Sequence, residues 1–307
     1  MNHWKIIVNP NAGMQKAGHD WKTIERLLKK YEVEFEVEFT QAKHHGIELT
    51  QAAIQQGFRN FAIVGGDGTL NEVVHGIFSQ TKIPTTEFTV GVIPVGTGND
   101  WCRMFDISND YSKAIRILKK RNIYVQDVGV VEYELGNRRE VRYFVNMTGM
   151  GYDAMVALQT NQQKDSGKAN RFSYFLNIFS ALFTYKTLNA KIIIDKQNFE
   201  SELFSLNVGI CKFNGGGMNQ LPKAIADDGL LDLKLIQPIR KIDLLLHIRK
   251  LYTGNYRNLR QVVYFQGKEI EIHALGNPVW MEVDGESLGH SPFHFWLKEK
   301  ALKIVRR

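Results

Sequence analysis

Three short loops rich in glycine and asparagine contain the residues best suited to chemistry. They are Asn9-Pro10-Asn11-Ala12-Gly13, Gly65-Gly66-Asp67-Gly68-Thr69-Leu70-Asn71 and Gly96-Thr97-Gly98-Asn99-Asp100. Glycine lets a backbone approach phosphate oxygens and present N–H groups to them, and the N-terminus of a following helix adds positive potential. One such loop is equally well explained as a turn that needs glycine. Three of them, each following an apolar run, predict a phosphate-binding site.

The second loop matches neither of the common nucleotide motifs. No Gly-Lys-Ser/Thr follows it, as in a Walker A loop, and its spacing is not GxGxxG. Phosphate binding then depends on backbone amides, with Asp67 as the distinctive side chain. Phosphates would repel this carboxylate unless Mg²⁺ lies between them or the carboxylate accepts ribose hydroxyls. The loop therefore predicts a magnesium–nucleotide ligand.

The elements expected to position these loops alternate between strand and helix. Strand patterns cover residues 4–9, 33–40, 61–66 and 90–96, and helical spacing covers 21–31, 46–57 and 71–80. Alternation up to about residue 120 predicts an α/β domain with a parallel sheet covered on both faces. Ligands of such sheets bind beyond the carboxyl ends of the strands, which is where all three loops lie.

After residue 123 the pattern becomes mainly β. Short strand-like segments are separated by turns, and good helical spacing is confined to regions near 169–188 and 240–252. This predicts a sandwich or an open barrel. We expect an α/β nucleotide-binding domain over residues 1–125 and a β-rich acceptor domain over 126–296. Whether segment 297–307 returns to the first domain stays open.

Composition narrows the class of partner. The 307 residues are 44% hydrophobic and 23% charged, as in a globular protein with two cores, and the net charge is +7. The lysines and arginines are scattered rather than interleaved with aromatics, which argues against nucleic acid and suits a nucleotide phosphate or an anionic membrane. Cys102 and Cys211 are far apart and indicate neither a disulfide framework nor a zinc site, so a reducing cytoplasm is expected.

Two further segments bear on localisation. The N-terminal MNHWKIIVNP lacks the charged head, apolar run and cleavage site of a signal peptide. The most apolar stretch, residues 171–188, includes polar residues and is too short in apolar content for a bilayer span. We therefore expect no transmembrane helix.

The loop motifs resemble those of a known family. GGDGTLNEVV, preceded by IVNPNAG and followed by GVIPVGTGNDWCR, is similar to the diacylglycerol kinase catalytic domain family, particularly the soluble bacterial lipid kinases related to diacylglycerol and sphingosine kinases. The similarity continues in NMTGMGYDAMV at 146–156, GGGMNQLPKAIADDGLLDLKLI at 215–236 and MEVDGE at 281–286. GGDGT alone also occurs in NAD kinases. The resemblance implies a phosphofructokinase-like and NAD-kinase-like first domain and a role in phospholipid biosynthesis, with ATP and Mg²⁺ as cofactors and a lipid hydroxyl as acceptor.

By motif matching, the resemblance assigns residues to the nucleotide phosphates. They are Asn9, Pro10, Asn11, Ala12 and Gly13, then Gly65, Gly66, Asp67, Gly68, Thr69, Leu70 and Asn71, and finally Thr40 and Thr97. Asp67 would also be catalytic. Thr40 begins Thr-Gln-Ala-Lys-His-His-Gly, which matches the family loop more loosely than the other motifs do.

The VDGE motif supplies the candidate proton acceptors. In relatives this segment carries the proposed general base, which here would be Asp284 or Glu286. The sequence does not choose between them. Without the resemblance, an Asp-Gly turn between two strands is the simpler interpretation.

Two metal assignments also follow from the resemblance. A structural Mg²⁺ loop would use Asp228 with backbone oxygens at Ile225 and Leu230. Asp127 falls where relatives place an acidic residue linked through water to the catalytic Mg²⁺. Without the resemblance, Asp-Asp-Gly is an ordinary turn signal.

Residues 168–186 are the candidate segment for contact with a lipid. This stretch is rich in aromatic residues and is preceded or opened by Lys164, Lys168 and Arg171. It suits either an interfacial helix or a helix packed inside the protein against the acceptor pocket. A basic run at 240–260 is secondary. We expect a cytoplasmic protein that contacts the inner membrane face transiently; its oligomeric state, a homodimer included, stays open.

The sequence is compatible with three functions. The first is a Mg²⁺-ATP lipid kinase. The second is a kinase of a soluble acceptor such as NAD, and the third is a regulatory protein that binds nucleotide or lipid with little transfer.

Overall fold

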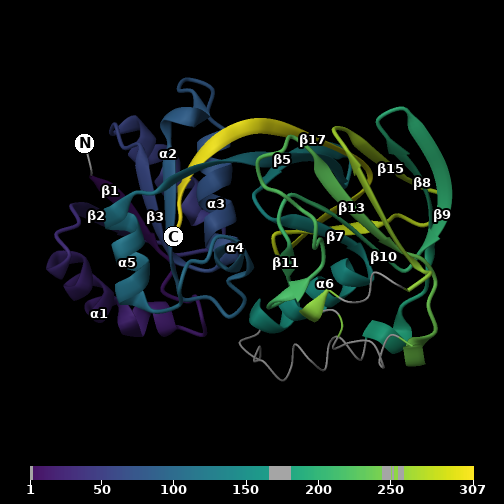
Figure 1. Ribbon diagram of the computed structural model, residues 1–307, viewed down its shortest axis with the longest axis horizontal. Helices are drawn as coiled ribbons and strands as arrows, with labels where there is room; N and C mark the ends of the chain where they lie inside the picture. Colours follow the sequence, from purple (N-terminus) through teal and green to yellow (C-terminus); the bar gives the residue numbers. More distant parts are fainter. Residues whose placement is uncertain (1–2, 166–180, 244–249, 251, 255–258) are drawn as a thin grey trace. The chain divides into compact units, whose positions relative to one another are not determined.

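The computed structural model describes residues 3–165, 181–243, 250, 252–254 and 259–307 (Figure 1). The chain folds into two compact units, one formed by Met1–Val128 with Glu299–Arg307 and the other by Gly129–Lys298.

The first unit is built on a parallel sheet. Its strands are β1 (Trp4–Val8), β2 (Phe35–Phe39), β3 (Asn60–Gly65), β4 (Thr89–Pro94) and the end of β17 (Glu286–Val305). They lie in the order β2-β1-β3-β4-β17, and each neighbouring pair is parallel. β1, β3 and β4 are buried along their whole length, as strands covered on both faces must be.

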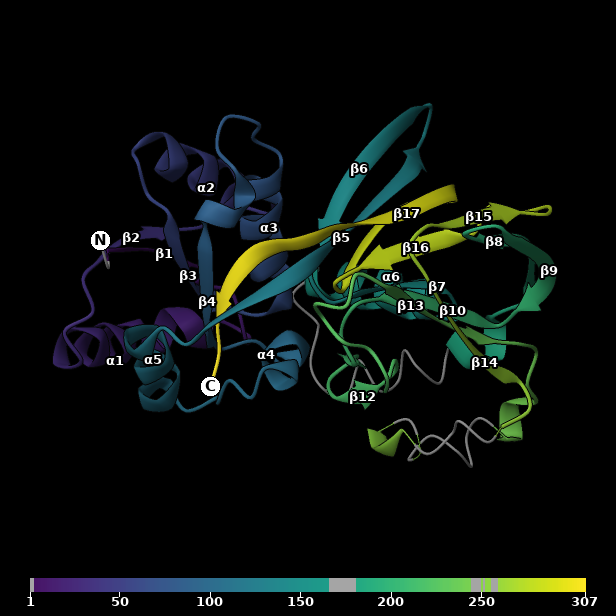
Figure 2. The same cartoon turned by 45° about the horizontal axis from the view of Figure 1, so that its top comes forward.

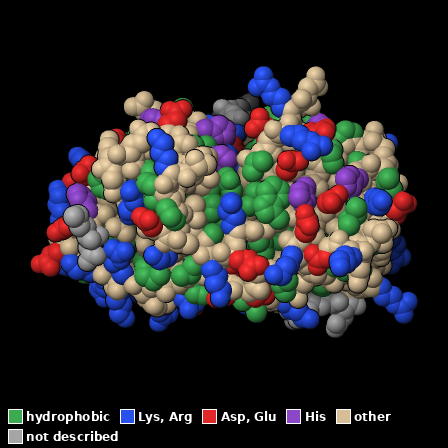
Figure 3. Space-filling view, turned by 90° about the horizontal axis from the view of Figure 1, so that it is seen from above, with side chains coloured by type: hydrophobic (Ala, Val, Ile, Leu, Met, Phe, Trp, Pro, Cys, Tyr) green, Lys and Arg blue, Asp and Glu red, His purple; other side chains and the backbone are tan. Residues whose placement is uncertain are grey.

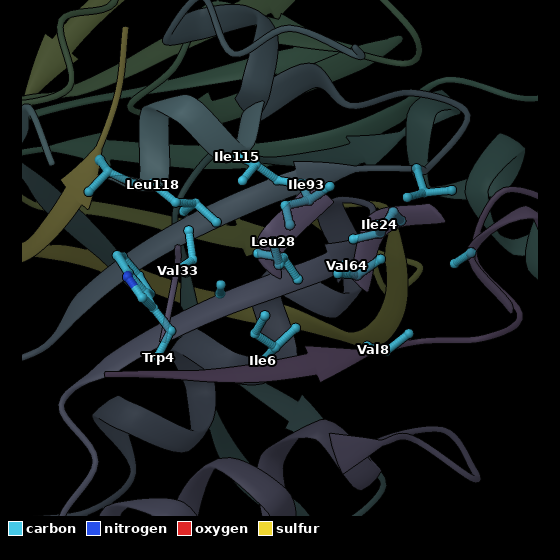
Figure 4. Close-up of a cluster of buried hydrophobic side chains, with 14 residues drawn as sticks. Trp4, Ile6, Val8, Ile24, Leu28, Val33, Val64, Ile93, Ile115 and Leu118 are labelled. Atoms are coloured by element: carbon cyan, nitrogen blue, oxygen red, sulfur yellow. The ribbon is translucent and has the colours of Figure 1, made fainter. Parts of the chain in front are cut away.

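Among the described residues, five helices accompany this sheet, and four of them form two contacting pairs. They are α1 (Lys16–Lys30), α2 (His45–Gln55), α3 (Asp67–Phe78), α4 (Asp100–Met104) and α5 (Tyr111–Lys120), with a short 3₁₀ turn η1 (Thr85–Glu87). α1 contacts α5, and α2 contacts α3 (Figure 2). Ile24 and Leu28 of α1 pack with Ile6 of β1 and with Ile115 and Leu118 of α5 in one buried cluster (Figure 4). The predicted α/β class is confirmed.

α3 begins earlier than the sequence pattern predicted. Its first residue is Asp67, so Gly68 to Asn71 are helical and only Gly65 and Gly66 precede the helix. A carboxylate is favourable in a first turn because it faces the positive end of the helix dipole. The predicted loop is therefore largely a helix N-terminus, the type of backbone that binds anions.

The second unit is mainly β, as predicted. Its strands are β5 (Ile123–Leu135), which begins in the first unit, β6 (Arg138–Phe144), β7 (Met147–Gly151), β8 (Leu188–Ile194), β9 (Gln197–Leu203), β10 (Ser205–Gly209), β11 (Phe213–Asn214), β12 (Met218–Asn219), β13 (Leu231–Ile236), β14 (Val262–Gly267), β15 (Ile270–Ala274), β16 (Trp280–Val283) and the start of β17. One antiparallel path runs β14-β13-β10-β7-β16-β17. A second path of paired strands runs from β17 through β15 and β8 to β9. β5 pairs with β17 and with β6.

The second unit also contains α6 (Tyr152–Asp165), a helix that the sequence pattern did not reveal. Its second half, Gln-Thr-Asn-Gln-Gln-Lys-Asp, has no apolar stripe, so period-based reasoning finds little there. α6 contacts β7, β10 and β16 and thereby lies over the MEVDGE strand. Of the two helices predicted near 169–188 and 240–252, the larger parts lie outside the described residues.

The visible surface carries both signs of charge. In the face drawn in Figure 3, lysine and arginine side chains alternate with aspartate and glutamate rather than forming one positive field.

Candidate active site

The three predicted loops meet at one edge of the parallel sheet. The Asn9 N–H donates to the Val64 carbonyl at 3.0 Å, and the Val95 N–H donates to the Gly65 carbonyl at 2.8 Å. The Asn9 side chain also donates from Nδ2 to Thr69 Oγ1 at 3.1 Å. The ends of β1, β3 and β4 are thus tied together by backbone and side-chain bonds.

Most of the loop glycines are required by close packing between these loops. A Cβ on Gly96 would lie 2.6 Å from the Gly66 Cα, and a Cβ on Gly13, whose φ is 62°, would lie 2.2 Å from the Val95 carbonyl oxygen. Gly68 differs, because a Cβ there would have no atom within 4 Å. Close packing thus explains Gly13 and Gly96, whereas Gly68 leaves open space at the start of α3.

Asp67 joins the second loop to the third. Its Oδ2 accepts the Asp100 N–H at 3.1 Å, and its Oδ1 accepts the Trp101 N–H at 3.2 Å. Burial raises the pKa of this carboxyl, and the two N–H donors partly offset the effect. Asp67 therefore caps α4, a structural role that the sequence did not show.

The remaining residues that were predicted to line the nucleotide phosphates differ in their exposure. Thr69, Leu70 and Asn71 are buried, so their side chains serve the interior of the first unit. Pro10, Ala12 and Gly13 are half-buried, whereas Asn11 and Thr97 are exposed at the loop surfaces. Any contact from Leu70 to a nucleotide would have to come from its backbone.

Thr40 follows β2, and its N–H donates to the Val8 carbonyl at 2.9 Å, directly before Asn9. The loop after it is held by a residue that sequence reasoning missed. Glu72 of α3 accepts the His44 N–H at 3.0 Å and the Gly46 N–H at 2.9 Å. Glu72 lies five residues after Asp67 in the GGDGTLNEVV motif, and this position could have marked it as a site residue.

Asp284 of the second unit is fixed by backbone donors. Its carboxylate accepts the N–H groups of Val145 at 3.1 Å, Asn146 at 3.2 Å and Met147 at 3.0 Å. The residue is 5% exposed and has a φ of 47°. The Asp-Gly turn predicted as the simpler interpretation is therefore present, and Asp284 anchors it to the start of β7.

Glu286 lies on the other side of this turn and forms an ion pair. Arg142 Nη2 donates to Glu286 Oε2 at 2.7 Å, and the two side chains are 7% and 14% exposed. The neighbouring Asn161 of α6 donates to the Gly285 carbonyl at 3.4 Å. Asp284 and Glu286 thus have different partners, although only Gly285 separates them.

Glu282 is a third carboxylate of this strand, and sequence reasoning overlooked it. It is 2% exposed, and burial, with help from the Asp153 and Asp284 charges, raises its pKa to about 8. Its position two residues before Asp284 in the MEVDGE motif could have identified it from the sequence. A carboxyl with such a pKa changes charge near neutral pH.

In the predicted cation loop, the Asp228 side chain bonds to the backbone of its own loop. Asp228 Oδ1 accepts the Leu230 N–H at 3.1 Å, and Ile225 is exposed. Nearby in sequence, Asp232 is 5% exposed, and its Oδ2 has no hydrogen-bond partner within the described part of the chain. No three Asp, Glu, His or Cys side chains of the described residues gather as a metal site, so backbone oxygens would have to complete this one.

Asp127, assigned by resemblance to a water link with the catalytic Mg²⁺, is fully buried in β5. Its Oδ1 accepts the Lys300 N–H at 2.6 Å. Its neighbour Gln126 accepts a bond from Trp101 Nε1 at 3.1 Å, so this part of β5 contacts the helix that Asp67 caps.

The proposed membrane segment is described only at its end. Residues 166–180, with Lys168 and Arg171, and the side chain of Lys164 lie outside the described residues. Ala181 and Leu182 are buried against Tyr152 and Phe204, whereas Phe183 is 63% exposed. Among the helices that the structure describes, none is long and apolar enough to span a bilayer.

Comparison with known proteins covers both units. Residues 3–131 match the diacylglycerol kinase catalytic domain, and residues 146–306 match the YegS C-terminal NAD kinase beta sandwich-like domain. Among curated relatives, the diacylglycerol kinase of Staphylococcus carnosus is 27% identical over 292 residues, covering 95% of this chain and 90% of that protein. The diacylglycerol kinase of Staphylococcus aureus strain bovine RF122 is 28% identical over 301 residues, covering 98% and 91%.

A solved structure shows the same fold. The crystal structure of a diacylglycerol kinase from Bacillus anthracis str. Sterne matches with a TM-score of 0.73 at 20% identity, covering 100% of this chain and 97% of that one. With both parts of the chain matched in order, the protein belongs to the diacylglycerol kinase catalytic domain family, as a diacylglycerol-kinase-like enzyme with a YegS-type β domain.

Proposed function

We propose that the protein is an ATP-dependent lipid kinase that transfers the γ-phosphate to the hydroxyl of diacylglycerol or a related lipid alcohol. One observation carries the nucleotide half of this proposal. The ends of β1, β3 and β4 converge, and Asp67 opens α3 there while its carboxylate accepts two N–H groups from α4. The family match supports the kinase reaction.

The nucleotide phosphates would bind the backbone N–H groups at the start of α3. Gly68 leaves open space there, and the helix dipole favours negative charge. Asn9 of the first loop donates a hydrogen bond to Thr69, and Thr97 lies exposed in the third loop, so the first and third loops flank this helix end. The arrangement binds phosphate by rigid backbone donors rather than by a lysine.

The VDGE hairpin would receive the proton of the acceptor. As the lipid oxygen bonds to the γ-phosphorus, the bond from that phosphorus to the ADP oxygen breaks, and the hydroxyl proton passes to a carboxylate. Three backbone N–H groups bond to the buried Asp284 carboxylate, whereas Glu286, which pairs with Arg142, is the more exposed of the two residues. We therefore assign the proton to Glu286 and the shape of the turn to Asp284.

Magnesium would neutralise phosphate charge in this reaction. Asp67, and Asp127 through water, would face the catalytic ion, and Asp228 with the Ile225 and Leu230 carbonyl oxygens would hold a structural ion. Asp232 follows this loop in sequence, and its Oδ2, which has no hydrogen-bond partner among the described residues, supports that assignment because a hard cation prefers oxygen ligands.

The acceptor places the enzyme at the cytoplasmic face of a membrane during turnover. Phe183 is exposed, and Lys241 Nζ lies 5.6 Å from the centre of its ring and donates to its carbonyl at 2.8 Å. An exposed aromatic beside a lysine suits an anionic bilayer surface.

Labelled ATP and Mg²⁺ with mixed micelles test the function. The micelles would contain diacylglycerol, phosphatidylglycerol, ceramide, sphingosine or undecaprenol, with NAD as a soluble acceptor. Labelled lipid that disappears in Asp67→Ala and Asp284→Asn supports the proposal. Label on NAD alone would favour a soluble-acceptor kinase, and nucleotide binding without any labelled product would favour a regulatory protein.

A further inference from the structure

Glu282 holds the turn that carries the two candidate acceptor carboxylates. Its Oε2 accepts the Gly285 N–H at 2.7 Å, and its Oε1 accepts Asn214 Nδ2 at 3.0 Å. Val283 pairs with Glu286 across the hairpin, and φ is 47° at Asp284 and 87° at Gly285. A two-residue hairpin of this type needs positive φ at both central residues. Glu282 therefore supports the turn from one side, while Asp284 anchors it to β7 from the other.

A buried polar row extends from Glu282 across the sheet. The strand register places Gly149, Asn207 and Lys234 successively beside it, on β7, β10 and β13. A Cβ on Gly149 would lie 2.6 Å from Glu282 Oε1 and 2.9 Å from the Asp153 Cβ. The missing side chain at Gly149 thus lets Asp153 of α6 come down next to Glu282.

The charges around Glu282 come from three elements. Asp153 lies on α6, where its Oδ2 accepts Ser205 Oγ at 2.9 Å and Asn207 Nδ2 at 2.7 Å. Asp284 lies in the turn, and Lys234, which is fully buried, lies on β13 beyond Asn207. The two carboxylates disfavour the charge on Glu282, whereas the Gly285 and Asn214 donors favour it.

We propose that Glu282 is a positioning residue for phosphoryl transfer, whose ionised carboxylate fixes the turn from which Glu286 reaches the acceptor. This inference rests on the proposed lipid kinase function. A hydrogen bond to an ionised carboxylate is shorter and stronger than one to a neutral carboxyl. The Gly285 N–H is therefore held more firmly when Glu282 is charged, and transfer becomes faster as Glu282 loses its proton.

The pH dependence of transfer tests this role. We would measure kcat with labelled ATP, Mg²⁺ and diacylglycerol micelles from about pH 6 to about pH 9, for the full-length protein and for Glu282→Gln. The wild-type kcat should rise with a midpoint near 8. Glu282→Gln should lack this rise and should lower kcat at the alkaline end by about tenfold or more, with KM for ATP changed less than about twofold. Wild-type kcat and an unchanged profile in Glu282→Gln would overturn the proposal.

Two further variants separate positioning from general stability. Glu282→Asp keeps an ionisable group, so it should be slower than wild type but retain a rise with pH. Asp195→Asn is the matched control, because Asp195 also holds a turn of the β unit, accepting the Lys268 N–H at 2.9 Å and the Glu269 N–H at 3.0 Å. Asp195→Asn should keep the wild-type profile. If Glu282→Gln does not fold, a Glu282→Asp profile without any rise would contradict the proposal.

A titration followed by NMR separates this inference from the proposed function. The Glu282 carboxyl carbon, identified by its absence in the glutamine or aspartate variant, and the Gly285 amide should titrate with one midpoint near 8. That result would support the coupling even if no lipid were phosphorylated, in which case only the function would fail. A Gly285 amide that does not follow the Glu282 carboxyl would contradict the coupling, whatever the acceptor.

Discussion

The Asp67 carboxylate accepts the backbone N–H of Trp101 at 3.2 Å, and this bond links the start of α3 to the start of α4. Its other oxygen accepts the Asp100 N–H at 3.1 Å. Asp67 therefore caps α4, and in the proposed function it would also face the nucleotide. To separate these two roles, a control variant that loses only a helix cap is needed.

Asp67→Ala should remove both stability and transfer. The loss of the cap should cost about 1–2 kcal/mol of the free energy of unfolding, and labelled lipid should disappear. Asp110→Ala is the matched control, because Asp110 caps α5 by accepting the Lys113 N–H at 3.0 Å. It should lose about 1 kcal/mol and keep transfer. Denaturant unfolding and the labelling assay measure the two effects, and full activity in Asp67→Ala would refute its catalytic role.

Gly68→Ala should separate folding from nucleotide binding. Open space surrounds the position, and alanine is favoured over glycine in a helix by about 1 kcal/mol, so the melting temperature should stay or rise. Its methyl group would occupy the space proposed for phosphate and weaken ATP binding about tenfold or more, as calorimetry would show. Gly96→Ala, which clashes with Gly66, should lose stability as well. Unchanged ATP affinity in Gly68→Ala would place the phosphates elsewhere.

Much of the first unit was predictable because β1, β3 and β4 are mainly apolar runs, β2 alternates apolar and charged residues, and the loops carry strong turn signals. The start of α3 was not, because Asp67 and Gly68 look like loop residues until the Asp67 bonds to α4 are known. α6 was missed because its polar second half lacks a helical stripe, and β7, β10 and β16 supply its packing instead. Such contacts are set by tertiary structure and leave little trace in local sequence.

Breaking the Arg142–Glu286 pair should destabilise the β unit. Glu286→Gln leaves a buried arginine without its charge partner, at a cost of about 3 kcal/mol. The double variant Arg142→Met/Glu286→Gln should regain most of that stability. If Glu286 takes the acceptor proton, the double variant stays inactive despite its recovered stability. Recovery of transfer together with stability would show that Glu286 acts only through the fold.

Stability should fall with rising pH because of Glu282. Its folded pKa of about 8 exceeds its ordinary value of 4.5, so the folded state binds the proton more tightly than the unfolded state. The stabilising contribution is complete below pH 4.5 and is lost as pH rises toward 8. Glu282→Gln should flatten this slope when urea unfolding is compared at both ends of the window. Parallel slopes in the two proteins would contradict the raised pKa.

Ionisation of Lys234 should change the stability over a separate range of pH. Burial lowers its pKa from 10.5 to about 8, so its destabilising effect is complete below pH 8 and diminishes as pH rises toward 10.5. Comparison below pH 8 therefore isolates Glu282 from this lysine.

A structural cation should raise the melting temperature. Saturating Mg²⁺ at about a hundred times its Kd would add about 2.7 kcal/mol to the folded state. Asp228→Asn should lose this response, whereas the neighbouring Asp227→Asn should keep it, since Asp227 is outside the proposed ligand set. Calorimetry without ATP or lipid measures the effect independently of catalysis. An equal response in both variants would exclude Asp228 as a ligand.

Site chemistry was only partly predictable for a related reason. The VDGE motif marked the hairpin, but the roles of its carboxylates depend on partners more than a hundred residues away in sequence, such as Val145 for Asp284 and Arg142 for Glu286. Glu282 escaped notice because burial and the approach of Asp153 beside Gly149 set its pKa, and neither is visible in the motif.

Single-turnover transfer of the labelled γ-phosphate from ATP to diacylglycerol in mixed micelles tests the proposed lipid kinase function directly. Wild-type protein and Asp67→Asn would be compared at equal folded fractions, with NAD present as a competing acceptor. The wild type should yield labelled phosphatidic acid, and Asp67→Asn should yield none. Label on NAD, or equal lipid labelling by both proteins, would contradict the proposed function.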